Sequence, residues 1–258
     1  MMLKKILLKA ISTFGIIWKI LPFPIRKRIF FGLFILETRG KSKSQSLKRI
    51  FQIEDYLNLV VNERALALGH GEHPKHSLTR YHDFFIDNLN DCLRIADLGC
   101  GYGAVSRSIA FAYPNSIVIG IDNNTERLNQ AKGIENPSNL QFELLDIDKF
   151  SPKQPMDGIV LSNVLEHVEE RVNFLKNMMI RTNPKKVLIR VPLFERHWTI
   201  PLRKELGVNY FQDEDHKIEH TILEFENEMT KSGLYISKIE TKWGEIWAVC
   251  LPILNSDE

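Results

Sequence analysis

Apolar runs alternate with helical patterns from residue 93 to residue 251. Short apolar runs bounded by polar turns predict strands, and the segments between them repeat apolar positions at helical spacing. Strands that alternate with helices are typical of a parallel sheet with helices on both faces. We therefore expect an α/β fold with a doubly wound, seven-stranded, mostly parallel sheet. The predicted strands are 95–98, 116–121, 140–145, 157–162, 186–191, 234–241 and 245–251, with helices at 104–113, 125–132, 167–180 and 222–231.

Helical patterns also precede the first strand, so an N-terminal helical extension is expected. The proline at position 22 and the proline at position 24 should end the first of these helices, because proline cannot continue a helix interior. The predicted helices are 1–21, 47–68 and 79–89, with a flexible polar linker at 39–46. We divide the chain into a basic amphipathic segment with its linker at 1–45, a helical lead-in at 46–92 and the sheet domain at 93–258.

The strand at 95–98 runs into a turn built from an acid and three glycines. Glycines accept positive φ and let backbone amides approach a ligand with no Cβ in the way. The helix that follows points its amide end at the same place, which favours a polar ligand. The turn is therefore expected to cradle a nucleotide-like cofactor, and its candidate binding residues are Asp97, Gly99, Cys100, Gly101 and Gly103.

Two kinds of cofactor fit this turn. The spacing Gly99-x-Gly101-x-x-Ala104, with Asp122 about 20 residues on, formally matches a dinucleotide fingerprint. A dinucleotide would bring a pyrophosphate beside Asp97, and the carboxylate would repel it. S-adenosylmethionine instead brings an ammonium group, which a carboxylate attracts. The position of Asp97 favours S-adenosylmethionine, and a nicotinamide-dependent oxidoreductase stays as the remote alternative.

The pattern Asp-x-Gly-x-Gly-x-Gly at residues 97–103 resembles the first motif of class I S-adenosylmethionine-dependent methyltransferases, which have a Rossmann-like fold. The resemblance implies that the acid ending the second strand, Asp122, binds the ribose hydroxyls, with Asn123 beside it. It also implies that Asp146 accepts the adenine amino group and that Ile147 supplies a backbone amide. Residues 163–168, which begin with Asn163, resemble the segment after the fourth strand in the ubiquinone-pathway O-methyltransferases.

Methylation of a hydroxyl group requires a base within hydrogen-bond reach. The candidate catalytic residues are His167 and His216, the latter oriented by Asp213 or Asp215. In some of the related enzymes a Glu-x-x-Glu-His set binds a divalent metal. This chain has Asn at the first of those positions, which removes an anionic ligand. We therefore predict no metal, although Glu166 and His167 leave the alternative open.

Charge is distributed unevenly along the 258 residues, whose net charge is +2. Residues 1–49 carry a net charge of +11 and the remainder carries −9. Basic character confined to one end argues against a general nucleic-acid surface. Three scattered cysteines indicate a reducing compartment, so a cytoplasmic protein is expected.

The basic end also contains apolar runs, which are too short to span a membrane. Lysines beside exposed aromatic side chains are typical of a segment lying on an anionic membrane surface. We expect peripheral contact through residues 1–36 at the inner face of the cytoplasmic membrane; the alternative is a helix packed on the domain. The histidine-rich stretch 70–76 is interpreted as a lid or substrate loop, with a solvated loop as the alternative.

The loops around residues 73–76 and 194–198 resemble those of enzymes found with bacterial surface-glycan biosynthesis. This resemblance implies an O-methyltransferase that acts on a sugar or glycolipid during surface polysaccharide synthesis. A quinone or lipid acceptor is the alternative within the same class. A cofactor-binding module without catalysis is the alternative outside it.

Overall fold

The computed structural model describes residues 15, 18–69 and 74–253. Most of the amphipathic helix predicted at 1–21, and both His70 and His73, lie outside these residues. The chain forms two compact units, which are residues 1–63 with 203–209, and residues 64–202 with 210–258. The larger unit contains the whole sheet.

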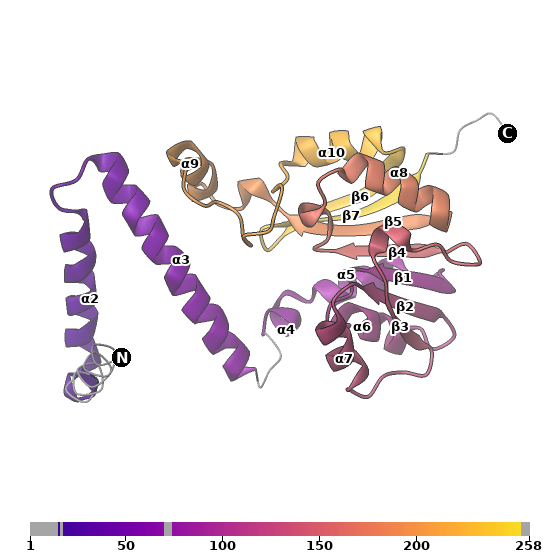
Figure 1. Ribbon diagram of the computed structural model, residues 1–258, viewed down its shortest axis with the longest axis horizontal. Coiled ribbons are helices and arrows are strands. Elements are labelled where there is room, and N and C mark those ends of the chain that lie inside the picture. Colours follow the sequence, from indigo (N-terminus) through magenta and orange to yellow (C-terminus); the bar gives the residue numbers. More distant parts are fainter. Residues whose placement is uncertain (1–14, 16–17, 70–73, 254–258) are drawn as a thin grey trace, which may run out of the picture. The chain divides into compact units, whose positions relative to one another are not determined.

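The seven strands of the larger unit form one sheet in the order β3-β2-β1-β4-β5-β7-β6. Figure 1 shows this order from β3 at one edge to β6 at the other. Strands β1 to β5 are parallel, whereas β7 pairs antiparallel with both β5 and β6. The strands are β1 Arg94–Leu98, β2 Ile117–Asp122, β3 Leu140–Leu144, β4 Gly158–Ser162, β5 Lys186–Pro192, β6 Leu234–Lys242 and β7 Glu245–Pro252. The predicted doubly wound α/β fold is confirmed.

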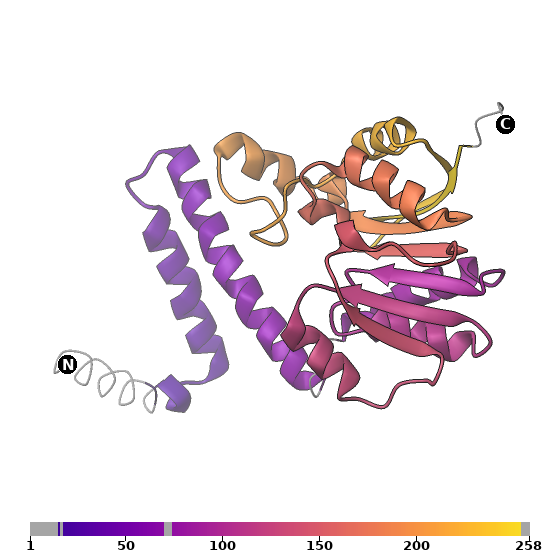
Figure 2. The ribbon, with the colours of Figure 1, turned by 45° about the vertical axis from the view of Figure 1, so that its right-hand side comes forward.

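Helices cover both faces of this sheet. Those of the larger unit are α4 Lys75–Thr79, α5 Tyr81–Asn88, α6 Ala104–Ala112, α7 Thr125–Lys132, α8 Arg171–Thr182 and α10 Ile222–Lys231, with 3-10 turns η1 Ile147–Lys149, η2 Leu165–His167 and η3 Phe194–Arg196. Side chains of α5 and α6 pack into one hydrophobic cluster and those of α8 and α10 into the other. In Figure 2 the orange α8 lies in front of the strands and the purple α6 behind them. Helix α9 Thr199–Leu206 crosses from the larger unit into the smaller.

Local sequence explains most of these boundaries. The start of α10 is fixed by a capping box, in which Thr221 and Glu224 bond each other's backbone amides. The turn between β6 and β7 consists of Trp243 and Gly244, both with positive φ, and such two-residue turns match the twist of a hairpin. This hairpin makes β7 run against β5.

Three predicted boundaries are wrong. The linker predicted at 39–46 is shorter, because helix α3 already begins at Lys43. The helix predicted at 79–89 begins only at Tyr81, because Arg80 has a φ of 53°, which breaks the helical backbone. Thr79 belongs to α4 instead. The helix predicted at 167–180 begins only at Arg171, so His167 lies in a 3-10 turn. Sequence reasoning also missed α4, α9 and the helix at Phe23–Thr38.

The smaller unit contains α2 Phe23–Thr38, most of α3 Lys43–Leu68 and residues 203–209. Phe51 is the buried residue of α3, and the guanidinium of Arg203 lies 4.4 Å from its ring centroid. Arg203 also bonds Glu54 at 2.8 Å and Asp55 at 2.9 Å. Of the described helices, none combines the length and apolar character needed to cross a membrane.

We expect Gly244→Ala to destabilise the larger unit. The backbone has a φ of 76°, and a Cβ there would lie 2.9 Å from Cβ of Arg196. Strain and clash together should lower the free energy of unfolding by about 2–4 kcal/mol, measured by denaturant titration. Gly207→Ala, with a φ of 67° but open space around it, is the matched control and should cost about 1–2 kcal/mol. Equal losses in the two variants would contradict the clash.

Candidate active site

The glycine turn after β1 has the backbone geometry of a cofactor cradle. Gly99, Gly101 and Gly103 have φ values of 73°, 54° and 72°. A Cβ on Gly103 would lie 2.4 Å from Phe142, and one on Gly99 would lie 2.7 Å from Val164. Gly101 has no atom within 4 Å of its Cβ position, so its backbone faces open space. Two glycines therefore permit close packing, and the third leaves room for a ligand.

Asp97 lies beneath this turn and is 1% exposed. Its Oδ2 accepts a hydrogen bond from the Ser106 hydroxyl at 2.5 Å. Burial raises the pKa of Asp97 to about 7, although the hydrogen bonds from Ser106 oppose this shift. A cation placed beside this carboxyl would favour its ionised form, which fits the ammonium group of S-adenosylmethionine.

Asp122 ends β2 and is held by the backbone of the neighbouring loops. Its Oδ2 accepts the N–H of Gly101 at 2.8 Å, and its Oδ1 accepts the N–H of Asn124 at 2.8 Å. Each carboxylate oxygen has a second lone pair, so the group can still accept bonds from two hydroxyls. This arrangement fits the predicted ribose-binding role.

The loop after β3 presents Asp146 and Ile147 to the same space. Asp146 caps η1, because its Oδ1 accepts the N–H of Asp148 at 3.1 Å. The cap leaves the other carboxylate oxygen available to a ligand. Both residues therefore suit the adenine-binding role implied by the sequence.

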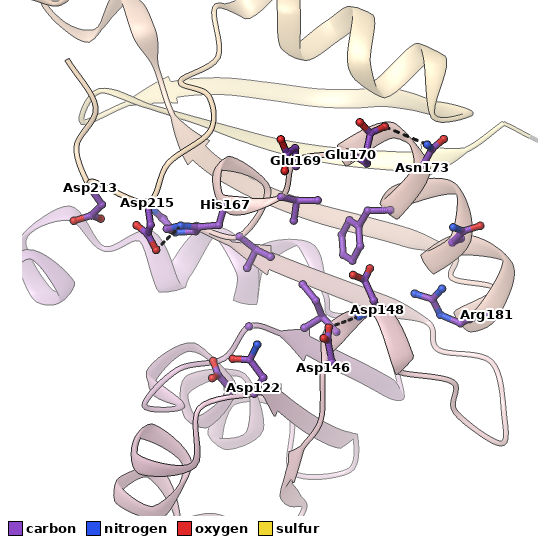
Figure 3. A pocket seen from close by; sticks show the side chains of 18 of the residues that line it. Asp122, Asp146, Asp148, His167, Glu169, Glu170, Asn173, Arg181, Asp213 and Asp215 are labelled. Carbon is purple, nitrogen blue, oxygen red and sulfur yellow. Dashed lines mark hydrogen bonds and ion pairs between the residues drawn. The ribbon is translucent and has the colours of Figure 1, made fainter. Parts of the chain in front are cut away.

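These loops line a cavity of about 980 Å³ at the carboxyl ends of the parallel strands, where open α/β sheets bind their ligands. Figure 3 shows its acidic wall and the position of His167. The predicted site residues that line it are Gly99, Asp122, Asn123, Asp146, Ile147, Asn163 and His167. The volume lies at the upper end of the range for small-molecule sites, which suits a cofactor together with an acceptor.

Of the two predicted bases, His167 lines the cavity and His216 does not. Nδ1 of His167 lies 3.2 Å from Oδ2 of Asp215 (Figure 3). His216 is buried, and its ring packs edge-on against that of His167 with 4.7 Å between centroids. Of the two acids predicted to orient His216, Asp213 does contact it, with Oδ2 3.6 Å from Nε2, whereas Asp215 contacts His167 instead. Glu219, which was not predicted, lies 3.3 Å from Nδ1 of His216.

Glu166 is fully buried next to both histidines, and neither of its carboxyl oxygens has a hydrogen-bond partner. Burial raises the pKa of Glu166 to about 8. Ligand atoms of Glu166, His167 and His216 lie within 4.8 Å of one another. These three side chains could hold a divalent cation, and the prediction that the chain uses no metal stays a prediction.

Several wall residues were missed by sequence reasoning. They lie on the segment that leads into α8, on α8 itself and in the loop after β3, and they are Asp148, Glu169, Glu170, Asn173 and Arg181. Residues 168–170 were assigned to a helix that in fact begins at Arg171. Position was the signal available for Asp148, which follows β3, and for Glu169 and Glu170, which follow β4 at the ligand-binding edge. Asn173 and Arg181 lie on α8 and carry no such signal.

The family model described as a methyltransferase domain matches residues 89–232, more than half of the chain. The chain belongs to the methyltransferase domain family. Trans-aconitate 2-methyltransferase of Streptomyces avermitilis is 38% identical over 89 residues, covering 33% of this chain and 33% of that protein. Ribosomal RNA small subunit methyltransferase C of Buchnera aphidicola is 27% identical, covering 61% of this chain and 44% of that protein. The matches thus span from a third to under half of these relatives' lengths.

Solved methyltransferases share the fold. Human N-acetylserotonin methyltransferase, solved with S-adenosylmethionine, has a TM-score of 0.57 and 16% identity, covering 74% of this chain and 56% of that chain. Magnesium protoporphyrin IX methyltransferase of Synechocystis, solved with S-adenosylhomocysteine, has a TM-score of 0.54 and 16% identity, covering 67% of this chain and 83% of that chain. The predicted class I methyltransferase fold and the predicted cofactor, S-adenosylmethionine, are confirmed.

We expect Asp122→Ala to weaken the binding of S-adenosylhomocysteine by about 30-fold or more, because a charged acceptor of two ribose hydroxyls is lost. Isothermal titration calorimetry measures the dissociation constant. Glu126→Ala removes an exposed acid from the first turn of α7 and is the control. Equal affinity in the Asp122 variant and the native chain would contradict the ribose-binding role.

Binding of S-adenosylhomocysteine should depend on the ionisation of Asp97. Its pKa of about 7 lies above the usual value, so the carboxyl is largely neutral at pH 6 and charged at pH 8. If the ionised form attracts the ligand ammonium, the dissociation constant should fall by about tenfold between these pH values. Calorimetry on Asp97→Asn should give the same affinity at both. A pH dependence that persists in Asp97→Asn would contradict this role.

Proposed function

We propose that this chain is an S-adenosylmethionine-dependent O-methyltransferase in which His167 is the general base. The observation that carries the proposal is the contact between His167 and Asp215 at a cavity that the cofactor-binding residues also line. A hydroxyl acceptor loses its proton as the new bond forms, so a base within reach is needed. An imidazole paired with a carboxylate is a common way to supply one.

S-adenosylmethionine, when bound, supplies a methyl group on a sulfonium. Asp215 accepts a hydrogen bond from Nδ1–H of His167, which fixes the tautomer and leaves Nε2 to accept the proton of the acceptor hydroxyl. The sulfonium methyl group would be transferred to the acceptor oxygen, and His167 would hold the proton that this oxygen loses. His216 supports the ring of His167. Burial, together with His167, lowers the pKa of His216, so His216 stays neutral while its neighbour takes the proton.

The charge of the cavity wall supports a neutral, hydroxyl-rich acceptor such as a sugar. Asp148, Glu169, Glu170 and Asp213 line the wall in addition to Asp215. Carboxylates accept hydrogen bonds from sugar hydroxyls and repel anions. Arg127 and Arg181 also line the cavity, but the carboxylates outnumber them. The same repulsion therefore disfavours a polyanion such as trans-aconitate or RNA at this position, and any phosphate attached to the sugar acceptor would have to lie away from this wall.

A sugar acceptor agrees with a role in surface polysaccharide synthesis, with the sugar carried on a lipid or a nucleotide. A lipid-linked sugar would place the reaction at the inner face of the cytoplasmic membrane. The second candidate is a quinone or other lipid acceptor. Exposed apolar side chains on α2 favour a lipid component in either case.

We expect His167→Ala to lower kcat by about 10²–10⁴-fold with little change in the affinity for S-adenosylhomocysteine, because the proton acceptor is lost and the cofactor site is kept. Methyl transfer to a panel of free and lipid-linked sugars is followed through release of S-adenosylhomocysteine. His197→Ala removes an exposed histidine that does not line the cavity and is the control.

Two outcomes would overturn the role of His167 as base. One is full activity of His167→Ala. The other is loss of activity on dialysis against a chelator with recovery on addition of a divalent cation, which would assign His167, Glu166 and His216 to a metal site. Failure of methyl transfer to every acceptor, with S-adenosylhomocysteine still bound, would contradict the sugar as substrate.

A further inference from the structure

We propose that α2 and the exposed side of α3 form a lipid-binding surface that docks on anionic membranes. Helix α2 has 16 residues and none of them is buried. The exposed large apolar residues of α2 are Phe23, Ile25, Ile29, Phe30, Phe31, Leu33, Ile35 and Leu36. A helix that leaves this many apolar side chains in water is costly, and exposed apolar patches of this kind mark interaction sites.

The apolar surface continues onto the part of α3 that belongs to the same unit. Its exposed members there are Tyr56, Leu57, Leu59, Val60 and Val61. Between the two helices lies a groove of about 550 Å³ lined by Leu33, Phe34, Leu36, Glu37, Arg49, Gln52, Ile53 and Tyr56. A mostly apolar groove of this size has room for part of an acyl chain.

The positive charge of the smaller unit indicates that the surface binds anionic lipid. The described residues from 18 to 49 contain nine Lys and Arg residues but a single acid, Glu37. That acid is already paired, at 3.2 Å with Lys41 and at 2.7 Å with Arg49. The first turns of α2 carry Arg26, Lys27 and Arg28 beside exposed phenylalanines. Cations next to aromatic and aliphatic side chains are typical of helices that lie on anionic lipid.

The amino-terminal end of α2 points to the same chemistry. Pro22 at the N-cap provides no side-chain hydrogen bond, and the first turn contains no acid. Helix N-termini attract anions, yet here the neighbouring side chains are cations. Lipid phosphates would supply the missing negative charge. A second copy of the chain would instead bring together two surfaces with net charges of about +8 each, which repel one another.

Co-sedimentation of the full chain with vesicles tests the proposal. Vesicles of phosphatidylcholine alone are compared with vesicles in which one third is replaced by phosphatidylglycerol, at low and high salt. We expect binding to the anionic vesicles only, with a loss of at least tenfold in affinity at high salt, because salt screens exposed charges. Absence of binding to anionic vesicles, or equal binding to both kinds, would overturn the proposal.

Two sets of variants separate the contributions of charge and apolar insertion. Phe23→Ser with Phe31→Ser keeps every charge, and the triple change to Gln at Arg26, Lys27 and Arg28 keeps every apolar side chain. Each should lower the vesicle affinity by at least tenfold. Matched controls on the larger unit should leave vesicle binding unchanged, and they are Phe111→Ser, whose ring is 65% exposed, and the triple change to Gln at Lys149, Lys153 and Lys176.

The result is independent of the proposed methyl transfer. All variants should bind S-adenosylhomocysteine with native affinity, which shows that the larger unit is folded. Activity on a water-soluble acceptor should also be unchanged in them. Loss of vesicle binding in the controls as well as in the α2 variants would show that α2 is not the lipid-binding surface. A failure of methyl transfer alone would leave the vesicle result standing.

Discussion

The site depends on the hydrogen bond from the N–H of Gly101 to the carboxylate of Asp122. It links the turn after β1 to the end of β2, and the N–H groups of Gly99 and Cys100 strengthen this link by donating to the carbonyl of Ile121. These backbone hydrogen bonds and the buried carboxylate together restrain the conformation of the turn. A cofactor meets a preformed backbone surface, so little ordering is needed on binding.

Two buried carboxyl groups set the electrostatics around this turn. Burial raises the pKa of both Asp97 and Glu166 above its usual value. Between about pH 4 and pH 8 the folded chain therefore keeps these protons, whereas the unfolded chain releases them. The contribution of both groups to the free energy of unfolding falls as the pH rises through this range. A positive ligand next to either group would reverse this effect. The ammonium group of S-adenosylmethionine would be such a ligand for Asp97.

Local patterns explain why the sheet and the cofactor loops could be predicted. Each strand carries its own apolar run, and the glycine spacing fixes the turn without reference to the rest of the chain. The histidine cluster is different, because His167 and His216 meet only through packing between segments far apart in sequence. The burial of His216 and the pairing of Asp215 with His167 therefore could not be predicted. Arg80, which adopts a positive φ without being glycine, carries no local signal either.

Charge separation within the chain connects the two proposals. The cavity wall is acidic, whereas the segment around α2 is strongly basic. Exposed charges act over about 10 Å at moderate salt, so each surface affects only the groups that bind directly to it. The acidic wall suits the hydroxyl groups of the proposed sugar and disfavours phosphate. The basic segment suits the anionic phosphates of the membrane that would carry a lipid-linked sugar.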